Sequence, residues 1–358
     1  MSAGELKGVR FPGRYIQGPG ALARLGPEVA AYGPRALVLL DAGVFALFEA
    51  QVRAAVEGHG QADIARFGGE CTLGAIEAAA AAARETGAAV IVGMGGGKAL
   101  DAAKAAGVDA GLPVIVVPTI AASDAPCSAL SVIYNDDGSV SHDRFLPRNP
   151  DLVLVDTAII AAAPPRFLAA GIGDALATWY EAASCEKSGG LNCLSLPGLP
   201  LAFTIAAACR DVIFEHGAAA MAECARGEAG PALERIVEAN ILMSGLGFES
   251  GGVATAHAVH HGLTMLDETH HALHGEKVAI GILTGLAMQR QEAEFARVAG
   301  FFEAVGLPTR LADIGLAEAS AEKLRVVAER ACRPGEIIHN EPYLVEPDMV
   351  VAALGRLA

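Results

Sequence analysis

The first 156 residues alternate short apolar runs with longer alanine-rich stretches, and this alternation restricts the fold more than any other feature of the sequence. The apolar runs fit buried strands, and the stretches between them have the length and composition of amphipathic helices. Strands alternating with helices predict a parallel sheet covered by helices on both faces. The expected strands are 36–40, 63–67, 89–92, 113–117 and 152–155, and the expected helices are 44–56, 73–85 and 99–106.

A short hairpin is expected between the last two of these strands. Residues 131–134 and 139–140 have a strand-like pattern, and residues 135–138 between them end in Asp-Gly. This pair is typical of tight turns in β-hairpins.

After Asp156 the strand-like runs disappear, and long segments rich in Ala, Leu and Glu follow. We therefore expect two domains, a Rossmann-like α/β domain at 1–160 and an all-helical domain at 161–358. The expected helices of the second domain lie near 166–187, 199–215, 217–225, 231–246, 251–266, 275–298 and 319–332.

The composition excludes several classes of partner. A net charge of −15 without any Lys/Arg run argues against nucleic acid. The seven cysteines form no C-x-x-C pair, which favours free thiols in a reducing compartment over disulfides. The N-terminus lacks the apolar core of a signal peptide, and Gly and Pro interrupt the longest uncharged stretch, at 188–209. We expect a cytoplasmic protein with no membrane span.

A glycine-rich segment, GMGGGK at 93–98, follows the third expected strand and precedes a helix. Glycines at such a turn allow backbone N–H groups to approach a phosphate, and the helix N-terminus favours its negative charge. The spacing fits neither a P-loop nor the usual dinucleotide fingerprint. The alternative is a tight turn without a ligand.

Asp41 ends the first expected strand. An acid in this position often accepts a hydrogen bond from an adenosine ribose and disfavours a 2′-phosphate, which would select NAD over NADP. The alternative is a solvated loop acid.

Six of the ten histidines fall between positions 257 and 274. Imidazole is the commonest ligand for zinc-like ions, and His257 and His261 are four residues apart, on one face of a helix. A catalytic site needs about three protein ligands and an open position. Asp174 is the candidate carboxylate, since a charge within an apolar helix is costly unless it is paired; the alternative is a helix cap. The six histidines are His257, His260, His261, His270, His271 and His274.

Several segments together resemble the iron-containing (group III) alcohol dehydrogenases, most closely their zinc-dependent, glycerol-oxidising branch. The resemblance runs almost end to end. The segments are GMGGGKALDAAK at 93–104, PTIAASDAPCSALSVIY at 118–134, LPRNPDLVLVDT at 146–157, GIGDALATWYEA at 171–182, GFESGGVATAHAVHHG at 247–262, HHALHGEKVA at 270–279 and HNEPYLVEPDMVVAAL at 339–354.

The resemblance implies a dehydroquinate synthase-like fold and assigns roles to individual residues. Asp174, His257 and His274 match the zinc ligands, and Asp124 matches a contact to the polyol. The residues that match dinucleotide contacts are Asp41, Gly96, Gly97, Lys98, Thr119, Ser128, Leu130 and Tyr134.

Two positions depart from the branch. Ala122 stands where a small hydroxyl residue is usual, and His261 stands where Asn is usual and where iron-type relatives carry a His. His261 is a candidate for proton transfer, with a structural histidine as the alternative. The metal expected is Zn²⁺, with Fe²⁺ as the alternative.

The reaction implied is oxidation of glycerol, or a similar vicinal diol, by NAD to dihydroxyacetone, with the metal acting as a Lewis acid. The resemblance also suggests a homo-oligomer, up to an octamer. Three alternatives stay open at this point: a family dehydrogenase for glycerol 1-phosphate or propanediol, a lyase like dehydroquinate synthase, and a cofactor-binding module without catalysis.

Overall fold

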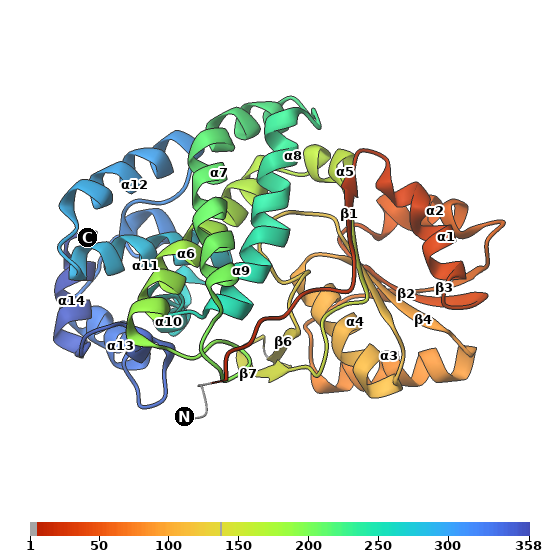
Figure 1. Ribbon diagram of the computed structural model, residues 1–358, viewed down its shortest axis with the longest axis horizontal. Helices are drawn as coiled ribbons and strands as arrows, with labels where there is room; N and C mark the ends of the chain where they lie inside the picture. The colour runs from red at the N-terminus through yellow and green to blue at the C-terminus, as the bar shows by residue number, and fades with distance from the viewer. Residues whose placement is uncertain (1–5, 137) are drawn as a thin grey trace, which may run out of the picture.

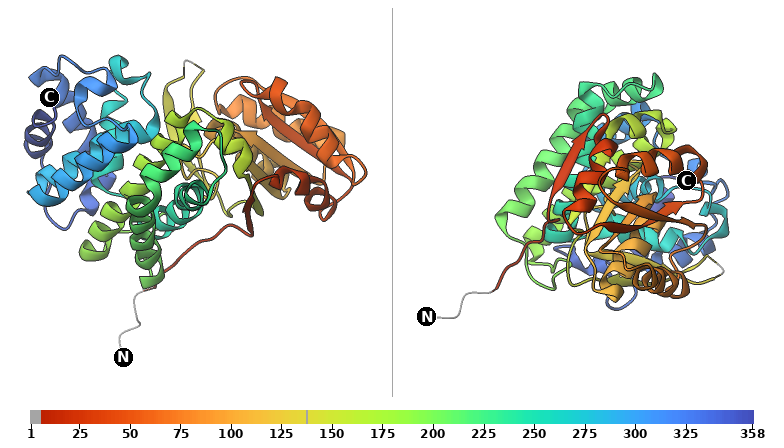
Figure 2. Two further views of the ribbon diagram at one scale, coloured as in Figure 1. Left: turned by 90° about the horizontal axis from the view of Figure 1, so that it is seen from above. Right: turned by 90° about the vertical axis from the view of Figure 1, so that its right-hand side faces the viewer.

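The computed structural model describes residues 6–136 and 138–358, and its α/β half and helical half lie side by side along the long axis of the molecule (Figure 1). The view from above shows the same division (Figure 2). Residues 1–5, which belong to the segment that lacks a signal-peptide pattern, and Asp137 of the expected hairpin turn lie outside the described residues.

One parallel sheet of six strands forms the centre of the α/β half in the described residues, in the order β1-β8-β5-β4-β2-β3. All five expected strands are confirmed. The edge strand β1 (Tyr15–Gly18) was not expected, because its four half-buried residues are too few to show a pattern. The other strands are β2 (Arg35–Asp41), β3 (Gln61–Phe67), β4 (Val90–Gly95), β5 (Val114–Pro118) and β8 (Leu152–Asp156).

The expected hairpin is also confirmed. Strand β6 (Leu130–Tyr134) pairs antiparallel with β7 (Val140–Phe145), and Leu130 lies opposite Phe145. The hairpin forms a separate sheet beside the parallel one.

Successive side chains of the central strands enter opposite layers, as strand geometry requires. Val38 and Leu40 pack in one cluster with the helices of one face, and Leu37 and Leu39 pack in another with those of the opposite face. The first layer contains η1 (Ala21–Arg24), α1 (Leu25–Ala30) and α2 (Phe45–Val56), and the second contains α3 (Leu73–Thr86) and α4 (Gly97–Ala110).

The helical half packs around α6, and its core continues onto the sheet through Val116 and Val153. The division at residue 160 therefore does not separate two independent cores, and it stays a prediction. The elements are α5 (Thr157–Ala162), α6 (Pro165–Ser188), α7 (Pro200–Ala225), α8 (Pro231–Val237), the π-helical turn η2 (Glu238–Met243), α9 (Ser244–Gly251), α10 (Thr255–Leu263), η3 (Asp267–Thr269), α11 (His274–Met288), α12 (Glu292–Val305), η4 (Leu311–Ile314), α13 (Ala321–Ala331), η5 (Ile337–Asn340) and α14 (Pro347–Gly355).

Three expected helix boundaries were wrong. Helix α7 runs without a break through Gly217, whose missing side chain leaves room for the ring of Phe301. The segment expected as one helix at 275–298 is two helices, because Arg290 adopts a left-handed backbone conformation (φ 54°) between them. The expected helix at 251–266 begins later, since Gly252 at φ 99° ends α9. None of the described helices combines the length and apolar composition needed to cross a membrane.

Candidate active site

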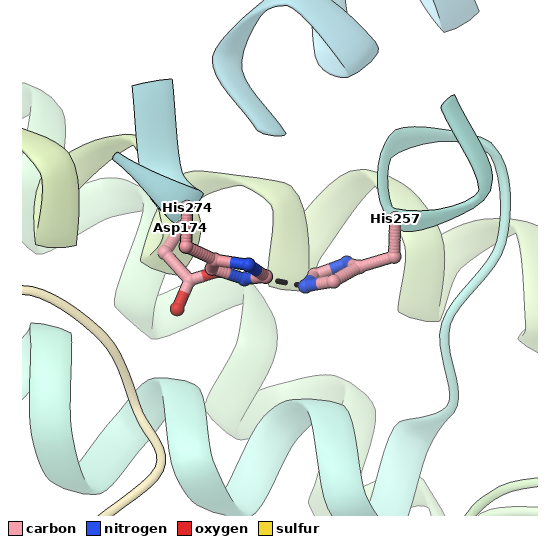
Figure 3. A group of neighbouring side chains, drawn as sticks. All are labelled: Asp174, His257 and His274. Atoms are coloured by element: carbon pink, nitrogen blue, oxygen red, sulfur yellow. Dashed lines mark hydrogen bonds and ion pairs between the residues drawn. The ribbon is translucent and has the colours of Figure 1, made fainter. Parts of the chain in front are cut away.

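Three side chains that were predicted as metal ligands meet in the helical half. Asp174 comes from the middle of α6, His257 from α10 and His274 from the first turn of α11 (Figure 3). Asp174 Oδ1 lies 3.1 Å from Nε2 of His274 and 3.4 Å from Nε2 of His257. One potential ligand atom from each residue lies within 4.8 Å of the others. The structure therefore brings together all three residues of the predicted set.

The start of α11 reaches this cluster because it packs directly against the backbone of α6. A Cβ atom at Gly275 would lie only 1.8 Å from the carbonyl oxygen of Ala170, and one at Gly173 would lie 2.6 Å from the carbonyl oxygen of Gly275. Glycine at these positions permits the close approach that places His274 beside Asp174.

The chemistry of the cluster suits a divalent cation. Asp174 is almost fully buried, and such a charge is costly unless it is compensated. Burial opposes its ionisation, but His274 and His257 outweigh this effect and hold the pKa of the Asp174 carboxyl below its usual range. A carboxylate and two imidazoles that converge in this way match the donor set of a zinc-type site with an open position.

Asp124 lies beside this cluster. Its N–H donates to Asp174 Oδ2 at 3.3 Å, and its own Oδ2 accepts a hydrogen bond of 2.6 Å from Ser244 Oγ. Ser244 in turn bonds to Thr178 Oγ1 at 2.9 Å. Burial, and next repulsion by Asp174, raise the pKa of Asp124. The predicted substrate contact is therefore next to the predicted metal ligands, while its role stays a prediction.

Two further histidines of α10 have different surroundings. His274 Nδ1 lies 3.1 Å from Nε2 of His260. Burial, and next the coulombic effect of His274, lower the pKa of His260 well below its usual range. His261 Nδ1 instead lies 3.1 Å from Glu336 Oε1, and His261 is not part of the three-residue cluster. The proposed proton-transfer role of His261 stays a prediction.

The predicted dinucleotide residues gather at one edge of the sheet. Asp41, Gly96 and Thr119 occur at or just after the carboxyl ends of β2, β4 and β5, which are neighbours in the sheet. Thr119 N–H donates to the carbonyl of Gly95 at 3.0 Å. Gly95 has φ 149°, and a Cβ there would lie 2.4 Å from Asp41 Cβ. Ligands bind at this edge in open α/β sheets.

Two lysines, Lys98 and Lys104, contact several of the other predicted residues on this side. Lys98 Nζ lies 2.6 Å from Glu70 Oε1 and 4.9 Å from the ring centre of Tyr134. The fully buried Lys104 donates from Nζ to the carbonyls of the loop that contains Ser128 and Leu130. Gly97, the first residue of α4, lies in the predicted glycine-rich turn. The binding roles of these residues stay predictions.

Sequence reasoning missed Glu181 and Ser244, which support the metal cluster and Asp124, and Lys104, which holds the loop before β6. Glu181 is as strongly buried as Asp174 and occurs seven residues later on the same helix. The argument that singled out Asp174, a charge within an apolar helix, applies equally to Glu181. Ser244 gave no comparable signal, because only the fold brings it to Asp124.

Comparison with known proteins gives relatives over almost the whole chain. A glycerol dehydrogenase of Pseudomonas putida is 48% identical over 350 residues, which is 97% of this chain and 96% of the relative. A glycerol dehydrogenase of Thermotoga maritima is 49% identical over 355 residues, or 96% and 94% of the two chains. The crystal structure of a probable glycerol dehydrogenase from Sinorhizobium meliloti, 42% identical, superposes with a TM-score of 0.93 over 98% of both chains.

Residues 12–157, which hold the sheet and the glycine-rich turn, match the family described as iron-containing alcohol dehydrogenase. The family match covers the sheet half alone. The near full-length relatives extend the similarity over the helical half, which contains the cluster of Asp174, His257 and His274. The chain therefore belongs to the iron-containing alcohol dehydrogenase family.

Proposed function

We propose that the protein is an NAD-dependent dehydrogenase that oxidises glycerol, or a similar vicinal diol, to the hydroxyketone. The observation that carries the proposal is the convergence of Asp174, His257 and His274 beside Asp124, in a chain whose near full-length relatives are glycerol dehydrogenases. We propose that the reaction takes place between the two halves, with the cofactor bound at the sheet edge and the metal in the helical half.

Asp174, His257 and His274 would hold one divalent ion, for which we propose Zn²⁺, with Fe²⁺ as the alternative. When bound, the ion supplies Lewis acidity that eases loss of the alcohol proton. His274 Nδ1 lies 3.1 Å from Nε2 of His260, and this contact holds the ring of His274 with its Nε2 facing Asp174. Asp174 is 1% exposed and so is shielded from bulk water, whereas the side chain of His274 is 40% exposed.

Asp124 is proposed to orient the substrate by accepting a hydrogen bond from a second hydroxyl. Ser244 fixes the carboxylate through its bond to Oδ2, and Thr178 fixes Ser244. A substrate with two neighbouring hydroxyls can use both the metal position and Asp124, which favours a diol over a simple alcohol. His261, held by Glu336, is the proposed group for passing the proton to solvent.

On the opposite side, Asp41 is proposed to accept a hydrogen bond from the adenosine ribose. The turn at Gly96 and Gly97, followed by Lys98, is proposed to bind the pyrophosphate at the start of α4. The rest of the dinucleotide would be lined by Thr119, Ser128, Leu130 and Tyr134.

The testing experiment measures NADH formation from NAD and glycerol before and after treatment with a chelator, with Zn²⁺ or Fe²⁺ added back. We expect activity that the chelator removes and that Zn²⁺ restores. Parallel assays with 1,2-propanediol and glycerol 1-phosphate separate the alternatives within the family. Absence of turnover with glycerol and other vicinal diols in the metal-loaded protein would contradict the polyol assignment.

We also propose that the protein is a homo-oligomer. Large apolar side chains of the helical half are exposed on the single chain, among them Leu201 and Leu344, which is 75% exposed. Light scattering during size-exclusion chromatography measures the assembly directly, and a monomeric mass would contradict it.

A further inference from the structure

Glu181 is a buried carboxylate for which the proposed reaction supplies no role. It lies on α6 and is about two helical turns from Asp174, on the same side of the helix. Its side chain is 2% exposed, which would be costly for an ion without compensating hydrogen bonds.

Three donors from the start of α10 compensate this charge. Glu181 Oε1 accepts the N–H groups of Ala254 and His257, each at 2.9 Å, and Oε2 lies 2.6 Å from Nδ1 of His257. Ala254 is the N-cap residue of α10 and has no side chain to accept these N–H groups. The carboxylate of Glu181, which belongs to α6, therefore caps the N-terminus of α10.

The same carboxylate fixes both the backbone and the ring of His257. With a proton on Nδ1 donated to Glu181, the lone pair of the imidazole is on Nε2, the atom that faces Asp174 at 3.4 Å. The partner of the second ring nitrogen decides which nitrogen of a histidine can bind a metal.

We propose that Glu181 is a positioning residue that holds His257 with Nε2 available at the metal position. The inference rests on the proposed metal role of the Asp174, His257 and His274 cluster. Glu181 acts through His257, so its loss changes the affinity for the ion rather than removing a ligand.

Glu181→Gln separates this role from a purely structural one. The amide oxygen can still accept the N–H groups of Ala254 and His257, so the cap of α10 is kept. The amide NH₂ then faces Nδ1 of His257 and favours the tautomer with the proton on Nε2, so that Nε2 is no longer available to a metal at the position beside Asp174. The matched control is Glu341→Gln, because Glu341 is also buried and joins Thr255 to Ser184 without contacting His257.

The readout is the dissociation constant for Zn²⁺, measured on metal-free protein by competition with a chromogenic chelator. We expect a 10- to 100-fold weaker affinity in Glu181→Gln, about the loss that follows removal of an outer hydrogen-bond partner, and an unchanged affinity in Glu341→Gln. If wild type and Glu181→Gln bound Zn²⁺ with equal affinity, the positioning role of Glu181 would be overturned, while the proposed function would stand. A wild-type protein that binds no Zn²⁺ would overturn the proposed function together with it.

A measurement on the unsubstituted protein keeps the proposal testable if Glu181→Gln does not fold. In zinc-loaded protein with ¹⁵N-labelled histidine, the His257 signals, assigned by their absence in His257→Asn, report which ring nitrogen carries the proton. We expect the proton on Nδ1. A metal bond through Nδ1 with the proton on Nε2 would overturn the assignment.

Discussion

Asp174 Oδ1 lies 3.1 Å from Nε2 of His274, although one hundred residues separate the two in sequence. The contact joins the middle of α6 to the first turn of α11, and it places one of the few charges of a long apolar helix where a cation can neutralise it. Both residues belong to the proposed metal site, Asp174 on α6 and His274 on α11.

His274→Ala is expected to remove metal binding and activity together. The loss should exceed the roughly 10- to 100-fold that removal of an outer partner causes, because a ligand itself is lost. Metal content after dialysis and the rate of NADH formation check this. His271→Ala is the control, since His271 is an exposed neighbour outside the cluster. Full metal content in His274→Ala would contradict its role as a ligand.

Gly275→Ala tests the close packing that brings α11 to α6. The new methyl group would lie 1.8 Å from the carbonyl oxygen of Ala170, so α11 must move and take His274 with it. We expect a loss of stability of about 1–3 kcal/mol, typical of overpacking, with weaker binding of Zn²⁺.

Gly300→Ala is the matched control for this change. Gly300 lies within α12, and a Cβ there meets no atom within 4 Å. The same substitution should therefore leave Zn²⁺ binding unchanged and raise stability by up to about 1 kcal/mol, because alanine favours a helix. Thermal unfolding of the two variants should shift in opposite directions, and equal shifts would contradict the packing argument.

Patterns visible in the chain predicted the fold class and a metal site, whereas the choice of Asp174, His257 and His274 as its ligand set came from the resemblance to a family. The apolar runs of the first half predicted the strands β2, β3, β4, β5 and β8, since a strand that is buried on both faces is apolar throughout. The density of histidines after residue 257 predicted the metal site in the same way.

The supporting residues could not be predicted by such patterns, because their partners are distant in sequence. Glu181 and His257 are 76 residues apart, and Ser244 and Asp124 are 120 apart. The break at Arg290 depends on a single residue in a left-handed conformation, which no periodicity reveals.

Asp41→Ser is expected to relax the preference for NAD. Asp41 ends β2 and accepts the N–H of Gly43 at 2.8 Å, a bond that serine can also accept. Loss of the carboxylate would remove the proposed hydrogen bond to the ribose and the repulsion of a 2′-phosphate. Hydrogen bonds to charged groups contribute about 1.5–3 kcal/mol, so the ratio of kcat/KM for NAD to that for NADP should fall roughly 10- to 100-fold.

Steady-state assays with both cofactors measure this ratio. The control is Asp63→Asn on the neighbouring strand β3, where Asp63 pairs with Arg35 at 3.3 Å. An unchanged ratio in Asp41→Ser would contradict the ribose contact.

Lys104→Met tests the anchor of the loop that follows β5. Lys104 Nζ lies 2.9 Å from Asp101 Oδ1 and 2.7 Å from the carbonyl oxygen of Ala125, and both charged side chains are buried. Methionine is similar in length but leaves Asp101 as an unpaired buried carboxylate. Breaking a buried pair in this way costs about 3–5 kcal/mol, so the melting temperature should fall clearly.

Asp101→Asn combined with Lys104→Met shows whether the unpaired charge is the cause. Removing both charges should recover part of the lost stability, because a buried ion pair adds little beyond its own desolvation cost. Neither variant replaces the lost bonds to the loop carbonyls, so the KM for NAD should be raised in both Lys104→Met and the double variant, while the melting temperature recovers in part in the double variant. A double variant no more stable than Lys104→Met would show that the carbonyl bonds, rather than the pair with Asp101, account for the loss.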